Sequence, residues 1–386
     1  MKILKLVFKN TLRHKLRTAL TILGISIAVV AFGFLRTVVT AWYAGVEASS
    51  PNRLITRNAV SFIFPLPLAY RDRIAQIPGV ETVAYMNWFQ GVYIDKSQFF
   101  ARFAVEMESS LKAYPEFLVP FDQREVLLKE RNACLVGSDL AKQYGFKIGD
   151  VIPIEGDIFP GRWEFVVRAI YQPRDKTVDG TQMWFHWQYL DERMKQEMPT
   201  RAGEVGWYIV RFSHPDDAAK ISQQVDEFFK NSRAETKTET EAAFQQSFVA
   251  GTGLIIQLLN FLSFVIIGII MLVLGNTMIM SARERTREYA VLKTLGFSGG
   301  SLVSLIAGES LIISVLGAVI GLLLTLPLVE MFSLFVPKSW FPVFYVEPIT
   351  YVLAGASALF VGIVSALFPI QRAVKTTIVE GLRFVG

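Results

Sequence analysis

Four long apolar stretches constrain this chain more than any other feature of its sequence. They cover residues 18–42, 251–280, 301–328 and 349–370, and each could cross a hydrocarbon core about 30 Å thick as a helix. Inside a bilayer the backbone must satisfy its own hydrogen bonds, which favours helices. The sequence therefore predicts an α-helical membrane protein with four transmembrane helices.

Basic side chains flank these stretches on one side of the predicted membrane. The first 17 residues carry six lysines and arginines and no acid, and the 281–300 loop and the 371–386 tail add more. Positive charge marks the cytoplasmic side of membrane helices. We therefore expect a multi-pass membrane protein with both termini cytoplasmic and with the region between the first two spans on the opposite side, periplasmic or extracellular.

The amino terminus has the pattern of an amphipathic helix lying on the membrane surface. Within residues 1–17, basic side chains recur at helical spacing opposite an apolar face. The basic side chains therefore lie where they can contact the headgroups of the lipid bilayer. This placement explains the net charge of +5 without nucleic acid as a partner. The expected membrane-interface residues are Lys2, Lys5, Lys9, Arg13 and, after the fourth stretch, Arg372.

Residues 43–250 have the polarity of a soluble domain, although the whole chain is 52% hydrophobic. Short alternating runs and frequent Pro and Gly predict an extracytoplasmic α+β domain. The lone cysteine, Cys134, cannot form an intramolecular disulfide.

A polar run from Glu235 to Gln246 is expected as a helical stalk leading to the second span. Candidate strands are Thr82–Tyr85, Val151–Pro153, Trp163–Tyr171 and Trp207–Phe212, and candidate helices are Leu68–Ile77, Asp139–Tyr144 and Pro215–Asn231.

The 281–300 loop reads SARERTREYAVLKTLGFSGG and has the pattern of a short docking helix. Acids and arginines interleave at helical spacing, and Tyr289, Leu292 and Leu295 form an apolar strip. Such a helix suits a groove in another protein, whereas the alternative is a solvated helix that only sets topology. In the closing FSGGS, Ser298 or Ser301 is expected to cap the next helix. The predicted coupling residues are Arg283, Glu284, Arg285, Thr286, Arg287, Glu288, Tyr289, Leu292 and Lys293.

This loop resembles the one between the second and third spans of MacB/FtsX-type permeases, in which E-R-T-R-E leads into a K-x-L-G turn. The ending PIQRAVKTTIVEGLR, at 369–383, resembles the family's carboxyl-terminal pattern. Residues 17–25 resemble its first-span start, and residues 136–150 resemble its periplasmic core domain. The resemblance covers the whole chain, less closely between 52 and 133.

The resemblance implies a permease subunit of an ABC transporter in the bacterial inner (cytoplasmic) membrane that works by mechanotransmission, with a MacB-type periplasmic core domain. It also implies a separate ATPase subunit that binds ATP and Mg, a second permease copy as homodimer or heterodimer, and, in some systems, a periplasmic adaptor and an outer-membrane duct. The dipeptide Gly-Lys is missing from the sequence, so the chain has no Walker A loop. We therefore expect no cofactor in this chain and ATPase activity only in its partner.

Two function classes remain open at this stage. One is a transporter for export or extraction, and the other is an FtsX-like transducer that activates a periplasmic enzyme; a lipoprotein-releasing permease is a further variant of the first. The size of the 43–250 domain favours the transporter. An enzyme or a metal centre is not expected, because the three histidines are scattered and HExxH does not occur.

Two features of the third span point to specific contacts. Glu309 is an acid inside an apolar stretch, where a charge is costly, so it is a candidate coupling residue. Ser304, Ser310 or a loop arginine could instead satisfy it structurally. Gly317 and Gly321 lie one helical turn apart and should allow another helix to approach closely.

Overall fold

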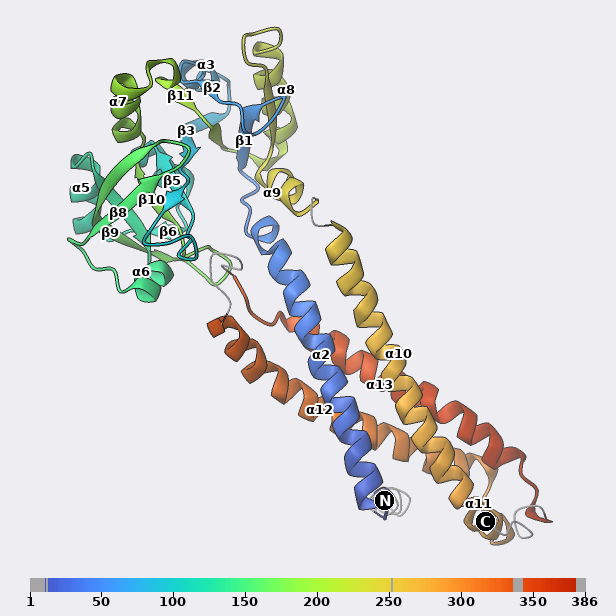
Figure 1. The fold of residues 1–386 in the computed structure, drawn as a ribbon. Helices are drawn as coiled ribbons and strands as arrows, with labels where there is room; N and C mark the ends of the chain where they lie inside the picture. The colour runs from blue at the N-terminus through green and yellow to red at the C-terminus, as the bar shows by residue number, and fades with distance from the viewer. Residues whose placement is uncertain (1–10, 12, 251–252, 336–342, 380–386) are drawn as a thin grey trace. The chain divides into compact units, whose positions relative to one another are not determined.

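The computed structural model describes residues 11, 13–250, 253–335 and 343–379. The chain divides into two compact units (Figure 1). The first, the helix bundle, is drawn from Met1–Ala41, Thr252–Val336 and Phe344–Gly386, and the second, the α+β domain, from Trp42–Gly251 and Pro337–Val343. The α+β domain is thus an insertion in the chain of the bundle.

Four helices of the described residues are long and apolar enough to cross a membrane, which confirms the predicted fold class. They are α2 (Lys15–Glu47), α10 (Gly253–Glu284), α12 (Gly299–Phe335) and α13 (Pro348–Lys375). A short helix, α11 (Thr286–Thr294), joins α10 to α12. The expected interfacial helix at 1–17 falls mostly outside the described residues, and so do Lys2, Lys5 and Lys9.

The bundle has its own apolar core where the helices meet. Ile25 of α2, Leu274 of α10, Tyr289 of α11, Ile306 of α12 and Val361 of α13 belong to this cluster. The outward faces of the helices carry exposed leucine, isoleucine and phenylalanine side chains, as expected for helices surrounded by lipid.

Glycines bring α12 against α2, which confirms the close approach predicted from their spacing. A Cβ added at Gly317 would lie 2.6 Å from the Cγ2 of Ile25, and one at Gly321 would lie 2.7 Å from the Cβ of Val29. The Ser26 hydroxyl also donates to the Gly317 carbonyl oxygen at 3.1 Å. Small residues therefore let the two backbones meet directly.

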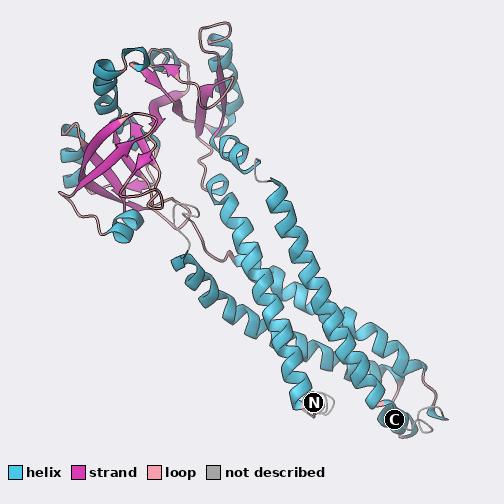
Figure 2. Cartoon of the chain, in the orientation of Figure 1, coloured by secondary structure: helices cyan, strands magenta, loops and turns pink. Residues whose placement is uncertain are grey.

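The α+β domain is built on an eleven-stranded sheet (Figure 2). Ten strands follow the order β13-β1-β12-β3-β5-β10-β7-β9-β8-β4, and β6 pairs with β9. Neighbours are antiparallel except in the parallel pairs β5–β10 and β7–β9. Strands β2 and β11 form a separate two-stranded sheet. The strands are β1 (Arg53–Asn58), β2 (Leu66–Pro67), β3 (Val80–Trp88), β4 (Gly91–Val92), β5 (Arg102–Val105), β6 (Phe117–Leu118), β7 (Ala133–Gly137), β8 (Val151–Gly156), β9 (Gly161–Pro173), β10 (Met183–His186), β11 (Glu204–Val205), β12 (Trp207–Phe212) and β13 (Thr236–Thr240).

Successive side chains of a strand point to opposite sides, so the large sheet has two apolar faces. Helices cover both of them. Leu54 and Tyr208 enter one apolar core and their neighbours Ile55 and Ile209 enter the other. The first core also receives side chains from α6 (Ser138–Tyr144), α7 (Trp187–Glu197) and α8 (Ala218–Phe228). The second receives them from α4 (Met107–Ala113), α5 (Phe121–Lys129) and α9 (Glu241–Ala250). The remaining helices are α3 (Tyr70–Ile74) and two short 3₁₀ turns, Pro199–Arg201 and Pro215–Asp217.

The predicted strands fall within β3, β8, β9 and β12, and the predicted helices overlap α3, α6 and α8. The helical stalk expected from Glu235 is wrong in its first part, because residues 236–240 form strand β13 beside β1. β-branched threonines alternate along this strand, a pattern that favours a strand over a helix. The hydroxyls of Thr236 and Thr238 both donate to Asp226 Oδ1, at 2.9 and 2.8 Å.

A buried ionic cluster lies where the chain enters and leaves this domain. Arg53, at the start of β1, donates through Nε to Glu241 Oε2 at 2.9 Å and through Nη1 to Glu116 Oε1 at 2.5 Å. Its guanidinium lies 4.1 Å from the centre of the Tyr114 ring. Glu241, the first residue of α9, also accepts the Ser50 amide at 2.7 Å. The cluster therefore fixes the two ends of the domain to each other.

Candidate functional site

The 281–300 loop folds as a helix with definite ends. Helix α11 stops before Gly296, which has a φ of +86° that glycine adopts without strain. The Phe297 amide donates back to the Leu292 carbonyl oxygen at 3.0 Å, as in helix ends closed by glycine. Ser298 Oγ then accepts the Ser301 amide at 3.3 Å and caps α12, as predicted.

One anchor of α11 is a buried ion pair with α12. Arg285 Nη1 donates to Glu309 Oε2 at 2.9 Å, and their side chains are only 4% and 9% exposed. Glu309 is thus paired with a loop arginine, one of the alternatives drawn from the sequence. Ser304 and Ser310 donate elsewhere, to the carbonyl oxygens of Gly300 and Gly362. Arg285 therefore faces the bundle and not the outer surface of the loop.

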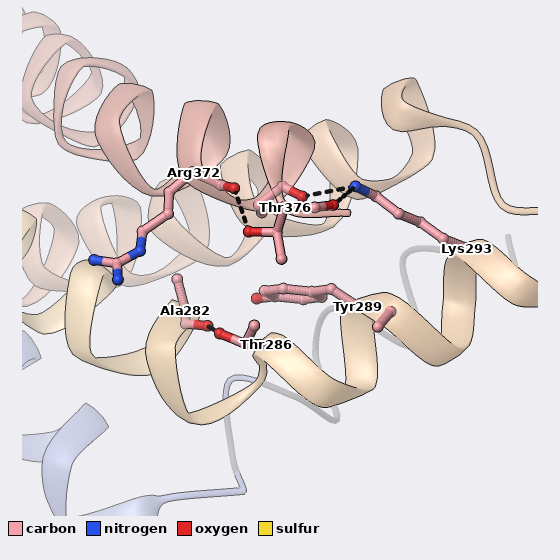
Figure 3. Close-up of a pocket in the computed structure, with 8 residues that line it drawn as sticks. Ala282, Thr286, Tyr289, Lys293, Arg372 and Thr376 are labelled. Atoms are coloured by element: carbon pink, nitrogen blue, oxygen red, sulfur yellow. Dashed lines mark hydrogen bonds between the residues drawn. The ribbon is translucent and has the colours of Figure 1, made fainter. Parts of the chain in front are cut away.

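A second anchor joins α11 to the end of α13. The Lys293 ammonium donates to the carbonyl oxygens of Ala373, Val374 and Thr376 at 3.1, 2.9 and 2.6 Å. These carbonyls end helix α13, where a cation also complements the helix dipole. Figure 3 shows this contact beside a shallow pocket lined by Tyr289 and Arg372, among others. Lys293 thus caps α13 and fastens α11 to it.

A third anchor comes from the amino-terminal end of α2. Arg17 forms two hydrogen bonds with the Glu284 carboxylate, at 2.8 and 2.6 Å. Arg13 Nη1 lies 2.5 Å from Glu288 Oε1. Glu284 and Glu288 interleave with Arg283 and Arg287 in the sequence, and the structure pairs both acids with α2 and the segment before it.

The predicted apolar strip is divided between two faces of α11. Tyr289 is buried in the bundle core and Leu292 packs partly buried against it. Leu295 is 70% exposed, and Val291, one turn earlier, is 42% exposed. The Thr286 hydroxyl is turned back to the Arg283 carbonyl oxygen at 2.9 Å. Two members of the strip therefore hold the helix in place, and one faces outward.

The outward face of the loop combines positive charge with apolar surface. Arg283 and Arg287 are exposed, and no ion pair among the described residues includes either of them. Val291 and Leu295 continue this face along the helix. Such a surface can contact an acidic, partly apolar groove of another protein. Arg283 lies in the last turn of α10 and Leu295 directly follows α11; together with Arg287 and Val291 we call them the outer face of α11.

The sequence reasoning missed two members of this site. Arg17 belongs to it as the partner of Glu284, although the two residues lie 267 positions apart. Val291 belongs to it through its spacing of four residues from Leu295, a signal that was present in the sequence. No group of His, Cys, Asp or Glu suited to a metal ion occurs among the described residues.

Comparison with known families supports a permease architecture over most of the chain. Residues 18–228 match the family described as MacB-like periplasmic core domain, and residues 260–378 match that described as FtsX-like permease C-terminal. The first match alone covers more than half of the chain, and it ends beyond α7 in the α+β domain. The second covers α11, α12, α13 and most of α10.

Individual relatives agree with these matches. The chain is 22% identical over 405 aligned residues to an uncharacterized ABC transporter permease of Methanocaldococcus jannaschii, with 99% of this chain and 97% of the relative covered. It is 23% identical over 265 residues to an uncharacterized ABC transporter permease protein of Mycobacterium tuberculosis, covering 67% of this chain and 29% of that protein.

Among solved structures, the extracellular domain of the ABC-type transporter YknZ from Gram-positive bacteria aligns with 49% of this chain and 100% of that domain. The TM-score is 0.36 and the sequence identity is 8%. A TM-score below 0.5 does not establish a shared fold.

Proposed function

This chain belongs to the MacB/FtsX-type family of ABC transporter permeases, and we propose that it couples ATP hydrolysis by a separate ATPase subunit to movement of its α+β domain. The moving domain would serve export or extraction of a substrate. Membership of the family implies an ATPase partner and dimerisation in general, and it suggests that this subunit is not itself an enzyme.

The observation that carries this proposal is the threefold anchoring of α11. Arg285 joins it to α12 and Lys293 joins it to α13. Glu284, the last residue of α10, is paired with Arg17 of α2. A helix held in this way moves with the bundle as one piece. A force applied to its outer face would therefore reach all four long helices.

The outer face of α11 is the proposed contact for the ATPase subunit. Its two exposed arginines and two exposed apolar side chains are available for an acidic and apolar groove. In this proposal the α11 end of the bundle and both termini are cytoplasmic, ATP and Mg are bound by the ATPase, and a second permease copy completes the complex. A periplasmic adaptor and an outer-membrane duct would extend the path of the substrate.

The direct test is co-purification of the full-length permease with candidate ATPase subunits from membranes. The double variant Arg283→Glu/Arg287→Glu should lose the ATPase that wild type retains, because it reverses the charge of the outer face. Arg162→Glu/Arg174→Glu is the matched control, since it reverses two exposed arginines of the α+β domain and gives the same net charge. Correct insertion of each variant is checked by its elution profile in detergent.

The outcomes separate two parts of the proposal. Loss in the α11 variant with retention in the control supports the outer face as the docking surface. Equal retention in both variants would rule out that surface. Absence of any ATPase with wild type, under conditions that preserve a known permease–ATPase complex, would count against the function itself.

A further inference from the structure

The α+β domain contains an aromatic groove that the proposed coupling site does not use. It lies between the 59–65 loop, the 157–160 turn and helix α7, and it has a volume of about 280 Å³. Pockets for small molecules begin at roughly this size. The walls carry five aromatic rings, namely Phe62, Trp88, Phe159, Trp187 and Trp207.

The walls of the groove are held in place by contacts within the domain. Trp187 Nε1 donates to Asn87 Oδ1 at 2.9 Å. The centroids of the Phe62 and Trp207 rings lie 4.8 Å apart. The walls of the groove are therefore positioned before any ligand arrives, which lowers the entropy cost of binding.

Most polar side chains of the lining are already engaged. Asp191 accepts the Gly203 amide at 2.6 Å and the Lys195 ammonium at 2.6 Å. Arg201 donates to the Ile158 carbonyl oxygen at 2.8 Å, and its guanidinium lies 4.6 Å from the centre of the Phe159 ring. These groups shape the wall and leave little free hydrogen-bonding capacity.

Glu204 is the exception among the charged residues of the lining. No ion pair and no side-chain hydrogen bond of Glu204 occurs among the described residues, although it lines the groove beside Trp207. The lining holds two acids, Asp191 and Glu204, and one base, Arg201, and a net negative charge attracts a cation, as the faces of aromatic rings also do. The charge of the lining therefore complements a positively charged ligand.

Apolar side chains remain uncovered in the same groove. Ile63 is 87% exposed and Ile158 is 37% exposed, and both line it. A ligand with an apolar body would remove these side chains from water, which favours binding. A small inorganic cation would leave them exposed.

We propose that this groove binds an amphipathic organic cation of small-molecule size, with its charge near Glu204 and its apolar body against the indole rings. The inference rests on the proposed function in one respect, because it names the class of substrate that the moving domain would handle. Binding itself does not require the ATPase and can be measured on the permease alone.

The test uses two probes that share size and shape but differ in the sign of their charge, tetraphenylphosphonium and tetraphenylborate. Tryptophan fluorescence of the full-length permease in lipid nanodiscs reports binding, because three tryptophans line the groove. Empty nanodiscs of the same lipid give the background from partition into the bilayer. We expect saturable binding of the cation, about tenfold tighter than that of the anion.

Two substitutions isolate the role of the carboxylate. Glu204→Gln should weaken binding of the cation about tenfold and remove the preference over the anion. Glu192→Gln on α7 is the matched control, because Glu192 pairs with Arg131 and does not line the groove. Ile63→Ser, at an exposed position, should weaken the binding of both probes to the same extent.

The proposal is overturned if the two probes bind equally, if neither saturates, or if Glu204→Gln keeps the preference for the cation while its unfolding temperature matches wild type. Co-purification with the ATPase is measured on the same variants. If Glu204→Gln loses cation binding but still co-purifies with the ATPase, the result supports ligand binding in the groove independently of the proposed ATPase contact. Failure of cation binding with intact ATPase capture would refute the groove alone.

Discussion

Arg285 and Glu309 form an ion pair within the helix bundle, joined at 2.9 Å, with both side chains nearly inaccessible to solvent. The arginine precedes α11 and the acid belongs to α12, so the pair ties the 281–300 loop to one of the four long apolar helices. Burying two charges is costly, and the cost is offset only while both partners are present.

Loss of either partner of this pair should therefore destabilise the bundle. We expect Arg285→Leu or Glu309→Leu to cost about 3–5 kcal/mol, and the double variant Arg285→Leu/Glu309→Leu to recover most of that loss. The measurement is the unfolding temperature of purified permease in one detergent. A double variant no more stable than the worse single variant would contradict the pairing.

The contact between α12 and α2 should tolerate no side chain at Gly317. Gly317→Ala places a Cβ against Ile25 and should cost about 1–3 kcal/mol, because the helices must separate. Gly355→Ala is the matched control, since a Cβ at that position of α13 meets nothing within 4 Å. Unfolding temperature in detergent distinguishes them. Equal effects of the two substitutions would mean that α2 and α12 do not pack as described.

The Arg53 cluster predicts a pH dependence in the α+β domain. Burial raises the pKa of Glu241, and Arg53 opposes that rise. In Arg53→Ala the folded-state pKa should rise further above the unfolded value of about 4.3. Because the folded state then binds the proton more strongly, stability should be greatest below that unfolded value and fall as pH rises through the folded one.

This effect is checked by urea unfolding of full-length permease followed by tryptophan fluorescence. We expect the stability loss of Arg53→Ala, relative to wild type, to grow between pH 5 and pH 8 toward about 3–5 kcal/mol. Arg53→Ala/Glu241→Gln should show a flatter profile, since the titrating group is gone. A loss independent of pH in the single variant would argue against an uncompensated Glu241.

His186 predicts a pH dependence of the opposite sign. Burial lowers the pKa of this histidine, whose Nε2 lies 2.7 Å from the Leu127 carbonyl oxygen. The unfolded state binds the proton more readily, so this contribution is complete above about pH 6.5 and is lost as pH falls through that value toward the folded pKa. The same urea experiment should show a smaller difference between pH 7.5 and pH 5.5 in His186→Gln. An unchanged difference would show that another group is responsible.

The sequence predicted those features that depend on composition or short spacing. The four spans follow from apolar length, and strand β12 follows from the run Trp207–Phe212. The partner of Glu309 could also be predicted in part, because a loop arginine was among its candidate partners. In each of these cases the deciding residues lie close together in the chain or belong to one uniform stretch.

Contacts between residues far apart in the chain could not be predicted from the sequence in this way. Arg53 is 2% exposed at the start of β1, a position where an isolated arginine gives no reason to predict a buried strand. Its burial makes sense only with Glu116 and Glu241, which lie 63 and 188 positions away. The pairing of Arg17 with Glu284 has the same origin. Chain folding, and not local pattern, brings these charges together.

The register of β1 with β13 has a consequence for how this chain can vary. Leu54, in the first strand of the α+β domain, pairs with Thr240, at the end of its last strand. Because its first and last strands are hydrogen-bonded neighbours, the inserted domain completes its own sheet. Another domain with the same arrangement could replace it in a related chain. Different inserted domains could then follow the same first transmembrane helix in related chains.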